Sequence, residues 1–305
     1  MTLMLLDAAS LYFRAFHGIP ESIVAPDGTP VNAVRGFLDM VAQLVRTRRP
    51  DRLVACLDAD WRPAFRVAAL PSYKAHRLAP DGTQEIVPDA LLPQVPVIEE
   101  VLAALGVAAV GVPGFEADDV IGTLADRDGG PVEVVSGDRD LFQVVRDDRP
   151  VRVLYIGRGV AKLEVVDAAW LARRYSIPLA DAGPSYADLA VLRGDPSDGL
   201  PGVPGIGEKT AAALVTRFGS LAAILAALDA GATDGFPAGA RNRLLAAQGY
   251  LAAAPAVVRV RLDVPVPEHD DTLPGDVAEP QRLVELAERW GLDSALNRVL
   301  AALSR

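Results

Sequence analysis

The sequence predicts an α/β fold in which a mainly parallel sheet carries helices on both faces and a smaller all-helical part follows. Short apolar runs alternate with segments of helical periodicity, as expected for parallel strands joined by helices. The runs are apolar almost throughout, which is typical of strands buried on both faces. Strand-like runs stop near residue 183, and Ala/Leu-rich helical segments follow. We therefore expect an α/β domain at residues 1–182 and a helical subdomain at residues 183–305.

The individual elements follow from local pattern. The predicted strands are Thr2–Leu6, Arg52–Leu57, Val107–Val110, Val132–Val135 and Val151–Tyr155. The predicted helices are Asn32–Arg46, Val97–Leu105, Ala117–Ala125 and Gln281–Trp290. Residues 262–280 are rich in Pro and acids and indicate a surface connection. Residues 66–94 show no periodicity over a length that is unusual for a loop in a compact domain, so we interpret them as a functional or mobile segment.

Composition bounds the function classes. The chain has 305 residues with 30 basic and 40 acidic side chains, a formal charge of −10, and a hydrophobic fraction of 50% that excludes wholesale disorder. A single cysteine, Cys56, excludes an intrachain disulfide framework and a thiolate zinc cluster. No apolar run approaches the roughly 18 residues that a membrane span needs, and the first residues lack the basic region of a signal peptide. We expect a cytoplasmic protein without a membrane partner.

Carboxylates recur where predicted strands end, where the helix at 117–125 begins, and just before a Gly/Pro-rich turn. These nine acids are Asp7, Asp58, Glu116, Asp118, Asp119, Asp138, Asp140, Asp195 and Asp198. Any one of them alone is more simply explained as a helix cap or turn residue. Their recurrence at three strand ends favours one cluster, because the carboxyl ends of parallel strands share an edge of the sheet.

Clustered carboxylates repel one another and need cations to stay ionised together. An all-oxygen ligand set suits Mg²⁺ or Mn²⁺, and two such ions about 3.5–4 Å apart can promote phosphodiester hydrolysis. Without the nine acids the remaining formal charge is −1, so the acidic balance does not exclude a polyanionic substrate.

A second motif lies in the helical part, at about residues 198–218. The stretch Leu-Pro-Gly-Val-Pro-Gly-Ile-Gly-Glu-Lys-Thr-Ala, residues 200–211, resembles a helix–hairpin–helix signature. Gly202, Gly205 and Gly207 would let the backbone approach a DNA phosphate, with Lys209 and the N–H groups near Thr210 at the start of the next helix. The alternative is a tight turn between two packed helices.

Basic and aromatic residues gather in the irregular segment at 66–94. Arg66, Lys74 and Arg77 could contact phosphates, and Tyr73 could stack on a base. Taken alone, this run is more simply explained as a solvated surface.

Together and in this order, the motifs resemble the bacterial 5′→3′ exonuclease and flap endonuclease family, which includes the N-terminal nuclease domain of DNA polymerase I. The resemblance covers most of residues 1–225. Its motifs are Leu6-Asp7 through Phe13-Arg14, Ala55-Cys-Leu-Asp58, Phe65-Arg66 with Tyr73-Lys74-x-x-Arg77, Gly114-Phe-Glu-Ala-Asp-Asp119, Ser136-Gly-Asp-Arg-Asp140 and Gly194-Asp-Pro-Ser-Asp198, followed by the hairpin. The resemblance implies a PIN-like, Rossmann-like nuclease domain with a helical helix–hairpin–helix (H3TH) subdomain.

The resemblance also implies roles for the site residues. One metal would be held mainly by Asp7, Asp58, Glu116, Asp118 and Asp138, partly through water, and a second would lie nearer Asp140, Asp195 and Asp198, with Asp119 close by. Lys74, Arg77 and Arg14 would act on the scissile phosphate. Residues 66–94 would form an arch that admits a free 5′ end. The backbone carbonyls of Pro201, Val203 and Ile206 would hold a K⁺ ion.

The function implied is a stand-alone, two-metal 5′ nuclease, monomeric, acting on DNA with 5′ flaps or ends and on RNA-primed DNA in replication and repair. Two alternatives stay open: a catalytically silent DNA-junction binder of the same fold, and a ribonuclease of PIN-like architecture. The chain departs from the family at Gly199, where the family usually has Asn, and a side-chain hydrogen bond to the neighbouring loop is expected to be missing.

Overall fold

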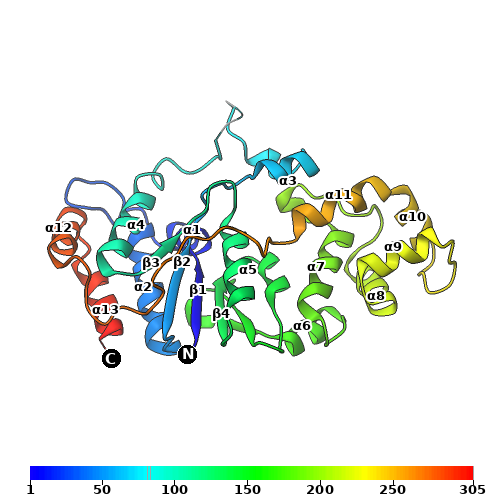
Figure 1. Ribbon diagram of the computed structural model, residues 1–305. Coiled ribbons are helices and arrows are strands. Elements are labelled where there is room, and N and C mark those ends of the chain that lie inside the picture. Colours follow the sequence, from blue (N-terminus) through cyan, green and yellow to red (C-terminus); the bar gives the residue numbers. More distant parts are fainter. Residues whose placement is uncertain (81, 83, 305) are drawn as a thin grey trace.

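The computed structural model describes residues 1–80, 82 and 84–304, and its strands form one sheet in the order β3-β2-β1-β4-β5-β6 (Figure 1). The strands are β1 (Leu3–Asp7), β2 (Arg52–Cys56), β3 (Ala108–Val110), β4 (Val132–Ser136), β5 (Val151–Tyr155) and β6 (Glu164–Val166). The first five pair in parallel, and β6 runs antiparallel to β5. The mainly parallel sheet is therefore confirmed. β6 was not predicted, because Glu164 interrupts its short apolar run.

Alternate residues of the central strands enter two separate cores. Leu3 and Leu5 of β1 belong to the core on one face, whereas Met4 and Leu6 belong to the core on the other. Both faces are covered by helices, so every residue of β1 is buried. This two-sided burial explains why the strand reads as an unbroken apolar run.

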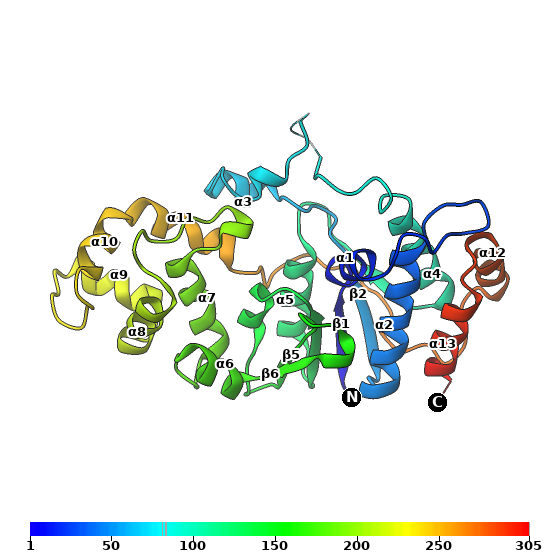
Figure 2. The ribbon, with the colours of Figure 1, turned by 180° about the vertical axis from the view of Figure 1, so that it is seen from behind.

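The helices give the molecule its remaining parts. They are α1 (Ala8–Gly18), α2 (Asn32–Arg48), α3 (Ala64–Ala69), α4 (Gln94–Leu105), α5 (Ala117–Arg127), α6 (Ala168–Tyr175), α7 (Ala182–Arg193), α8 (Glu208–Phe218), α9 (Leu221–Asp229), α10 (Ala240–Ala246), α11 (Gln248–Val258), α12 (Pro280–Trp290) and α13 (Asp293–Leu303). Helices α7 to α11 extend from one end of the sheet, and α12 and α13 lie at the other end (Figure 1 and Figure 2).

The last two helices lie apart from the helical subdomain in which we expected them. Leu283, Leu286 and Leu296 share a buried core with Met4 and Phe37 of the sheet side. The chain reaches this position because residues 259–279 return from α11 across the molecule (orange in Figure 1). On the way the Leu53 N–H donates to the Asp271 carbonyl oxygen at 2.8 Å. Position in the sequence alone therefore misled the assignment of residues 280–303.

The segment between α3 and α4 rises above the carboxyl edge of the sheet (Figure 1). Its described residues include the short 3-10 turn Ala75–Arg77 and an antiparallel bridge between Leu78 and Glu85. The proposed arch at 66–94 spans residues 81 and 83, which lie outside the described residues.

No single helix in the described ranges has the length and apolar composition to cross a membrane. The pair α8 and α9 meets that test only when joined, and it is bent by 78° between its members.

Candidate active site

An open pocket of about 660 Å³ lies beyond the carboxyl ends of β1, β2 and β4. Six of the nine predicted acids line it: Asp7, Asp58, Glu116, Asp118, Asp138 and Asp195. The parallel register sets Asp7 beside Cys56, the last residue of β2, so that Asp58 follows at the same edge. β4 pairs with the opposite side of β1, and Asp138 follows its last residue by two. Parallel pairing thus gathers three distant strand ends.

Asp7 is buried and held from two sides. Its carboxylate accepts the Ser10 N–H at 3.0 Å as the cap of α1, and it accepts the Ser136 hydroxyl at 2.6 Å. Burial raises the pKa of Asp7 to about 7; the two hydrogen bonds oppose this, and the charges of Asp58 and Asp138 add to it. Ionisation of Asp7 is therefore unfavourable in the folded chain, and a nearby cation would make it more favourable.

The pKa values of two further acids, Asp118 and Asp140, are also raised. Burial raises the pKa of Asp118 well above its ordinary value, and the carboxylates of Asp7 and Asp138 raise it further. Burial also raises the pKa of Asp140, with Asp138 and Asp198 adding to the shift. The cluster therefore holds more negative charge than its own side chains neutralise.

Glu116 is the N-cap of α5, and its carboxylate is paired with basic side chains. Its carboxylate accepts the Tyr73 hydroxyl at 2.8 Å and pairs with Lys74 and with Arg66, whose guanidinium nitrogen lies 2.6 Å away. Burial raises the pKa of Glu116 to about 7, although Lys74 and Arg66 oppose the shift. Glu116 is thus the point where the arch base meets the acid cluster.

Lys74 and Arg77, which were predicted to act on the scissile phosphate, lie on the arch side of the pocket and are paired with carboxylates. Lys74 donates to Glu116 and, at 3.3 Å, to the Trp61 carbonyl oxygen. Burial lowers the pKa of Lys74, but Glu116 and Asp198 more than offset this, so it stays protonated. Arg77 pairs with Asp198 at 2.7 Å. Each of these side chains is therefore held by a carboxylate at the edge of the pocket.

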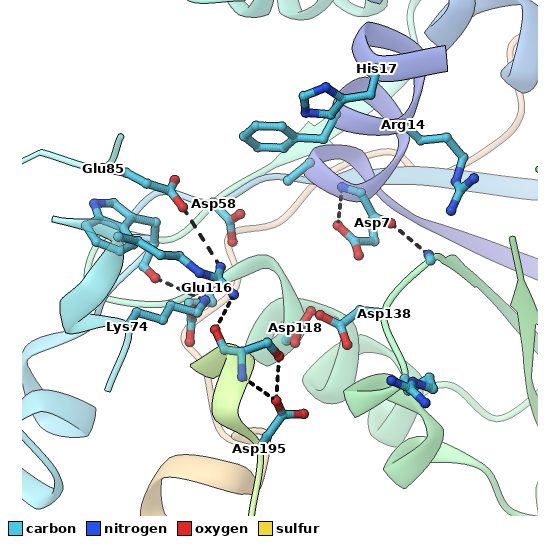
Figure 3. Close-up of a pocket in the computed structure, with 18 of the residues that line it drawn as sticks. Asp7, Arg14, His17, Asp58, Lys74, Glu85, Glu116, Asp118, Asp138 and Asp195 are labelled. Atoms are coloured by element: carbon cyan, nitrogen blue, oxygen red, sulfur yellow. Dashed lines mark hydrogen bonds and ion pairs between the residues drawn. The ribbon is translucent and has the colours of Figure 1, made fainter. Parts of the chain in front are cut away.

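Arg14 of α1 lies on the opposite side of the carboxylates (Figure 3). One of its terminal nitrogens donates to the Gly157 carbonyl oxygen at 3.0 Å. Its buried Nε has no hydrogen-bond partner among the described residues. The pocket therefore has cations on two walls and carboxylates between them.

The turn before the hairpin places the last acids. Asp195 caps the short helix Pro196–Asp198 by accepting the Ser197 N–H at 2.9 Å. The Asp198 carbonyl oxygen accepts the Lys74 N–H at 2.9 Å, so this turn lies directly against the arch base. Asp140 and Asp198 are not among the residues that line the pocket, and the charges of Asp138 and Asp198 raise the pKa of Asp140.

The hairpin presents an exposed backbone at the start of α8. Gly205, Gly207 and Lys209 are exposed, and Gly207 caps α8 without any side-chain hydrogen bond, so N–H groups of the first turn remain open. Thr210 is half-buried in that turn. Val203 and Ile206 are buried, with the Ile206 N–H donating to the Val203 carbonyl oxygen at 2.9 Å.

The structure contradicts two predicted roles around α5. Asp119, predicted near the second metal, is fully buried, and its carboxylate accepts two nitrogens of Arg66 and the Arg261 N–H, so it does not line the pocket. Arg66, predicted to bind DNA, is 2% exposed for the same reason. A carboxylate in this cluster can bind a metal or an internal arginine, and Asp119 binds the arginine.

Two other predicted DNA contacts are also buried. Tyr73 is 3% exposed and directs its hydroxyl to Glu116, so it has no free face for a base. Gly202 is buried, and a Cβ there would lie 2.3 Å from the Arg193 carbonyl oxygen. Its glycine serves close packing of the hairpin on α7 instead of an approach by phosphate.

The two parts of the chain match two family models in succession. The model of the 5′-3′ exonuclease N-terminal resolvase-like domain matches residues 2–176, and that of the 5′-3′ exonuclease C-terminal SAM fold matches residues 182–281. The chain belongs to the 5′-3′ exonuclease family. It is accordingly a nuclease.

Relatives within the family match over nearly the whole length. A 5′-3′ exonuclease of Streptomyces coelicolor is 58% identical over 305 residues, covering 99% of this chain and 100% of the relative. One of Mycobacterium tuberculosis is 56% identical, covering 99% and 97%. The DNA polymerase I of Mycobacterium bovis is 43% identical over 233 residues, and that match spans 75% of this chain but 24% of the polymerase.

Solved structures share the fold at low identity. A bacteriophage T5 flap endonuclease in complex with DNA and metal ions superimposes with a TM-score of 0.62 at 17% identity, covering 100% of both chains. The catalytic core of Rad2 in complex with DNA substrate gives 0.60 at 16% identity, covering 98% of this chain and 91% of that one.

The acid cluster of this exonuclease-family chain fits hard divalent cations by its chemistry. Its donors are carboxylate oxygens, and burial and mutual repulsion raise the pKa of Asp7 and Asp118, which a bound cation would relieve. Among the described residues, no three acidic, His or Cys side chains are arranged to hold an ion directly. Ions that keep several waters, as Mg²⁺ does, fit such a loose set.

Sequence reasoning missed several residues that line the pocket or hold its acids. Ser136 positions Asp7, and Trp61, Glu85 and Arg139 contribute to the wall. Ser136 is the first residue of the motif that ends at Asp140, but it was given no role there; its place at the end of β4 was a usable signal. Glu85 carried no such signal, because it lies near Arg77 within a segment that shows no periodicity.

Proposed function

We propose that this chain is a structure-specific 5′→3′ exonuclease and flap endonuclease that uses two or more Mg²⁺ or Mn²⁺ ions. The observation that carries the proposal is the open pocket in which six carboxylates face one another between two walls bearing cations (Figure 3). The T5 and Rad2 structures, solved with DNA, and in the T5 case with metal ions, support it.

The first ion would be held by Asp7, Asp58, Glu116, Asp118 and Asp138, partly through water, and a second by Asp140, Asp195 and Asp198. When bound, such ions supply charge for the phosphate and lower the pKa of water. Asp119 is left out of this ligand set because its oxygens are occupied.

The cations of the chain would bind the scissile phosphate. Lys74 and Arg77 would exchange Glu116 and Asp198 for phosphate oxygens as metal ions take over those carboxylates. Arg14, with an unpartnered Nε, would contribute from the opposite wall. These side chains orient the phosphate and stabilise the charge that develops on it.

The helical part would hold the duplex beside the junction. The open N–H groups at the start of α8, with Gly205, Gly207, Lys209 and Thr210, would contact backbone phosphates. A K⁺ ion on the carbonyls of Pro201, Val203 and Ile206 would stiffen the hairpin. Residues 66–94 would admit the free 5′ end. Substrates of this kind, 5′ flaps and RNA-primed ends, would place the protein, as a monomer, in replication and repair.

The test uses a labelled 5′-flap duplex and the purified chain. We expect cleavage near the junction with Mg²⁺ or Mn²⁺, and loss of cleavage in EDTA. Asp118→Asn should lower kcat by about 10²–10³-fold, while junction binding in EDTA persists. The control Asp276→Asn changes an exposed acid of the return segment and should cut normally.

Three results would count against the proposal. Cleavage that resists EDTA would reject the metal requirement. Junction binding without cleavage under any divalent ion would favour the silent binder. Cleavage of RNA alone, with flap DNA intact, would favour a ribonuclease.

A further inference from the structure

Arg66 lies at a crossing point of three parts of the chain. It belongs to α3 at the base of the arch, and its side chain is buried. One terminal nitrogen lies 2.6 Å from both the Glu116 and the Asp119 carboxylates, and the other lies 2.7 Å from Asp119. Its Nε donates to the Val257 carbonyl oxygen, in the last turn of α11, at 2.9 Å. Arg66 thus joins α3, α5 and α11.

Asp119 completes the arrangement from the other side. Besides Arg66, its carboxylate accepts the Arg261 N–H at 2.9 Å and the Glu116 N–H at 3.3 Å. The second of these bonds fixes the backbone from which the Glu116 side chain leaves. Asp119 therefore anchors both the start of the return segment and the first residue of the acid cluster on α5.

The pair controls where the Glu116 carboxylate can point. Tyr73, Lys74 and Arg66 all contact that carboxylate, and of the two basic residues only Lys74 lines the pocket. Arg66 has no solvent-facing route, because it is 2% exposed and committed to three partners. A buried guanidinium with its hydrogen bonds satisfied holds its partners rigidly.

We propose that Arg66 and Asp119 form a positioning pair that fixes the Glu116 carboxylate for the divalent ion and ties it to the end of α11. This rests on the proposed function and adds to it two residues that act through Glu116. Groups that orient a metal ligand typically change metal affinity by 10–100-fold when altered. The pair explains why α5 begins with two adjacent aspartates after its glutamate: Asp118 faces the pocket and Asp119 faces Arg66.

The test compares Arg66→Lys with Arg52→Lys. Lysine keeps the charge at position 66 but cannot reach two carboxylates and the Val257 carbonyl oxygen together. Arg52 is a matched control, because it also pairs with two carboxylates, Asp128 and Asp271, and also holds the return segment to the sheet. It does so at the start of β2, away from the acid pocket.

Mn²⁺ binding to the DNA-free chain is measured by calorimetry, alongside Tm and the kinetics of flap cleavage. We expect R66K to weaken Mn²⁺ binding about 10-fold or more, with kcat at limiting Mn²⁺ reduced and KM for the flap changed less than about twofold. R52K should lower Tm and leave Mn²⁺ affinity unchanged. Adding D119N to R66K should cost little further affinity, because the two side chains act together.

Equal Mn²⁺ affinity in R66K and wild type, with Tm lowered as in R52K, would overturn the proposal and leave Arg66 a structural residue only. If R66K does not fold, D119N alone decides by the same Mn²⁺ measurement. If the wild-type chain neither bound Mn²⁺ nor cleaved the flap, the proposed function itself would be rejected. Failure of the positioning pair and failure of the proposed function are therefore distinguishable.

Discussion

At the scale of single residues, the chemistry depends on carboxylates that are costly to ionise. Asp7 illustrates this, since burial raises its pKa to about 7 even though Ser10 and Ser136 both donate to it. A protonated folded-state acid stabilises the fold at low pH and loses that stabilisation as the pH rises. A bound divalent ion would offset the free-energy cost of ionising Asp7 at high pH. Stability, pH and metal are therefore linked at this residue.

The linkage predicts how Tm should vary. The contribution of Asp7 is fully present below its unfolded pKa near 3.8 and is lost as the pH rises through about 7. In EDTA, we expect Tm to fall between pH 5 and pH 8, and Mn²⁺ to raise Tm more at pH 8 than at pH 5. Thermal unfolding followed by circular dichroism measures both.

Asp7→Asn serves as the control, because an amide resembles the protonated acid. It should raise the metal-free Tm at pH 8 and reduce the rise in Tm that Mn²⁺ produces at that pH. If Tm did not vary with pH in either the wild type or the variant, the raised pKa of Asp7 in the folded chain would be contradicted.

At the scale of elements, the turn before the hairpin and the arch base are fitted to each other at Gly199. Its φ is +76°, and a Cβ there would lie 2.2 Å from the Ser72 carbonyl oxygen. The same approach lets the Asp198 carbonyl oxygen accept the Lys74 N–H. At Gly199, where the family usually has Asn, the turn thus meets the arch base through backbone atoms.

Gly199→Ala is predicted to separate these two segments. The added Cβ must push back the Ser72 carbonyl, which displaces Lys74 and Arg77 from the phosphate site. We expect flap cleavage to fall about 10-fold or more, since small misplacements of reacting groups are costly. Steady-state kinetics of the flap substrate provides the measurement.

Gly231→Ala is the matched control. Gly231 has a φ of +73° but open space around the site of a Cβ, so the substitution carries the backbone cost without the collision. Similar kinetics for the two variants would show that the collision at Ser72 has no consequence.

At the scale of the whole molecule, the chain closes on itself. It leaves the sheet for α7 to α11 and then returns along β2, so that α12 and α13 complete the core beside α2 and α4 (Figure 2). The nuclease part is therefore built from both ends of the sequence. Its stability should depend on residues that are far from every motif.

Leu286→Ala tests this dependence. Leu286 on α12 is 1% exposed, and its truncation should lower the free energy of unfolding by about 2–5 kcal/mol. Val284, two residues earlier, is 58% exposed, and Val284→Ala should change it by less than about 0.5 kcal/mol. Urea unfolding monitored by tryptophan fluorescence compares them. Equal midpoints would mean that α12 contributes nothing to the core.

The sequence by itself determined the elements whose signal is local. The five parallel strands, the helices predicted at 32–46 and 117–125, and the acids of the predicted cluster follow from apolar runs, periodicity and motif position. Six of the nine acids line one pocket, and Asp7, Asp58 and Asp138 among them lie at or just after strand ends. Burial on both faces demands continuous apolar runs, and parallel strands share one edge, so both inferences rest on general physics.

Only the tertiary structure decided how neighbouring residues divide their tasks. Asp118 and Asp119 are chemically the same, and α5 turns one to the pocket and the other to Arg66. Arg66 and Tyr73 were expected outside and lie inside, because their partners Glu116 and Asp119 come from a distant segment. The sequences of α12 and α13 did not indicate that these helices pack beside the sheet. Which partner a charged or apolar side chain meets depends on long-range packing, and no local pattern encodes that.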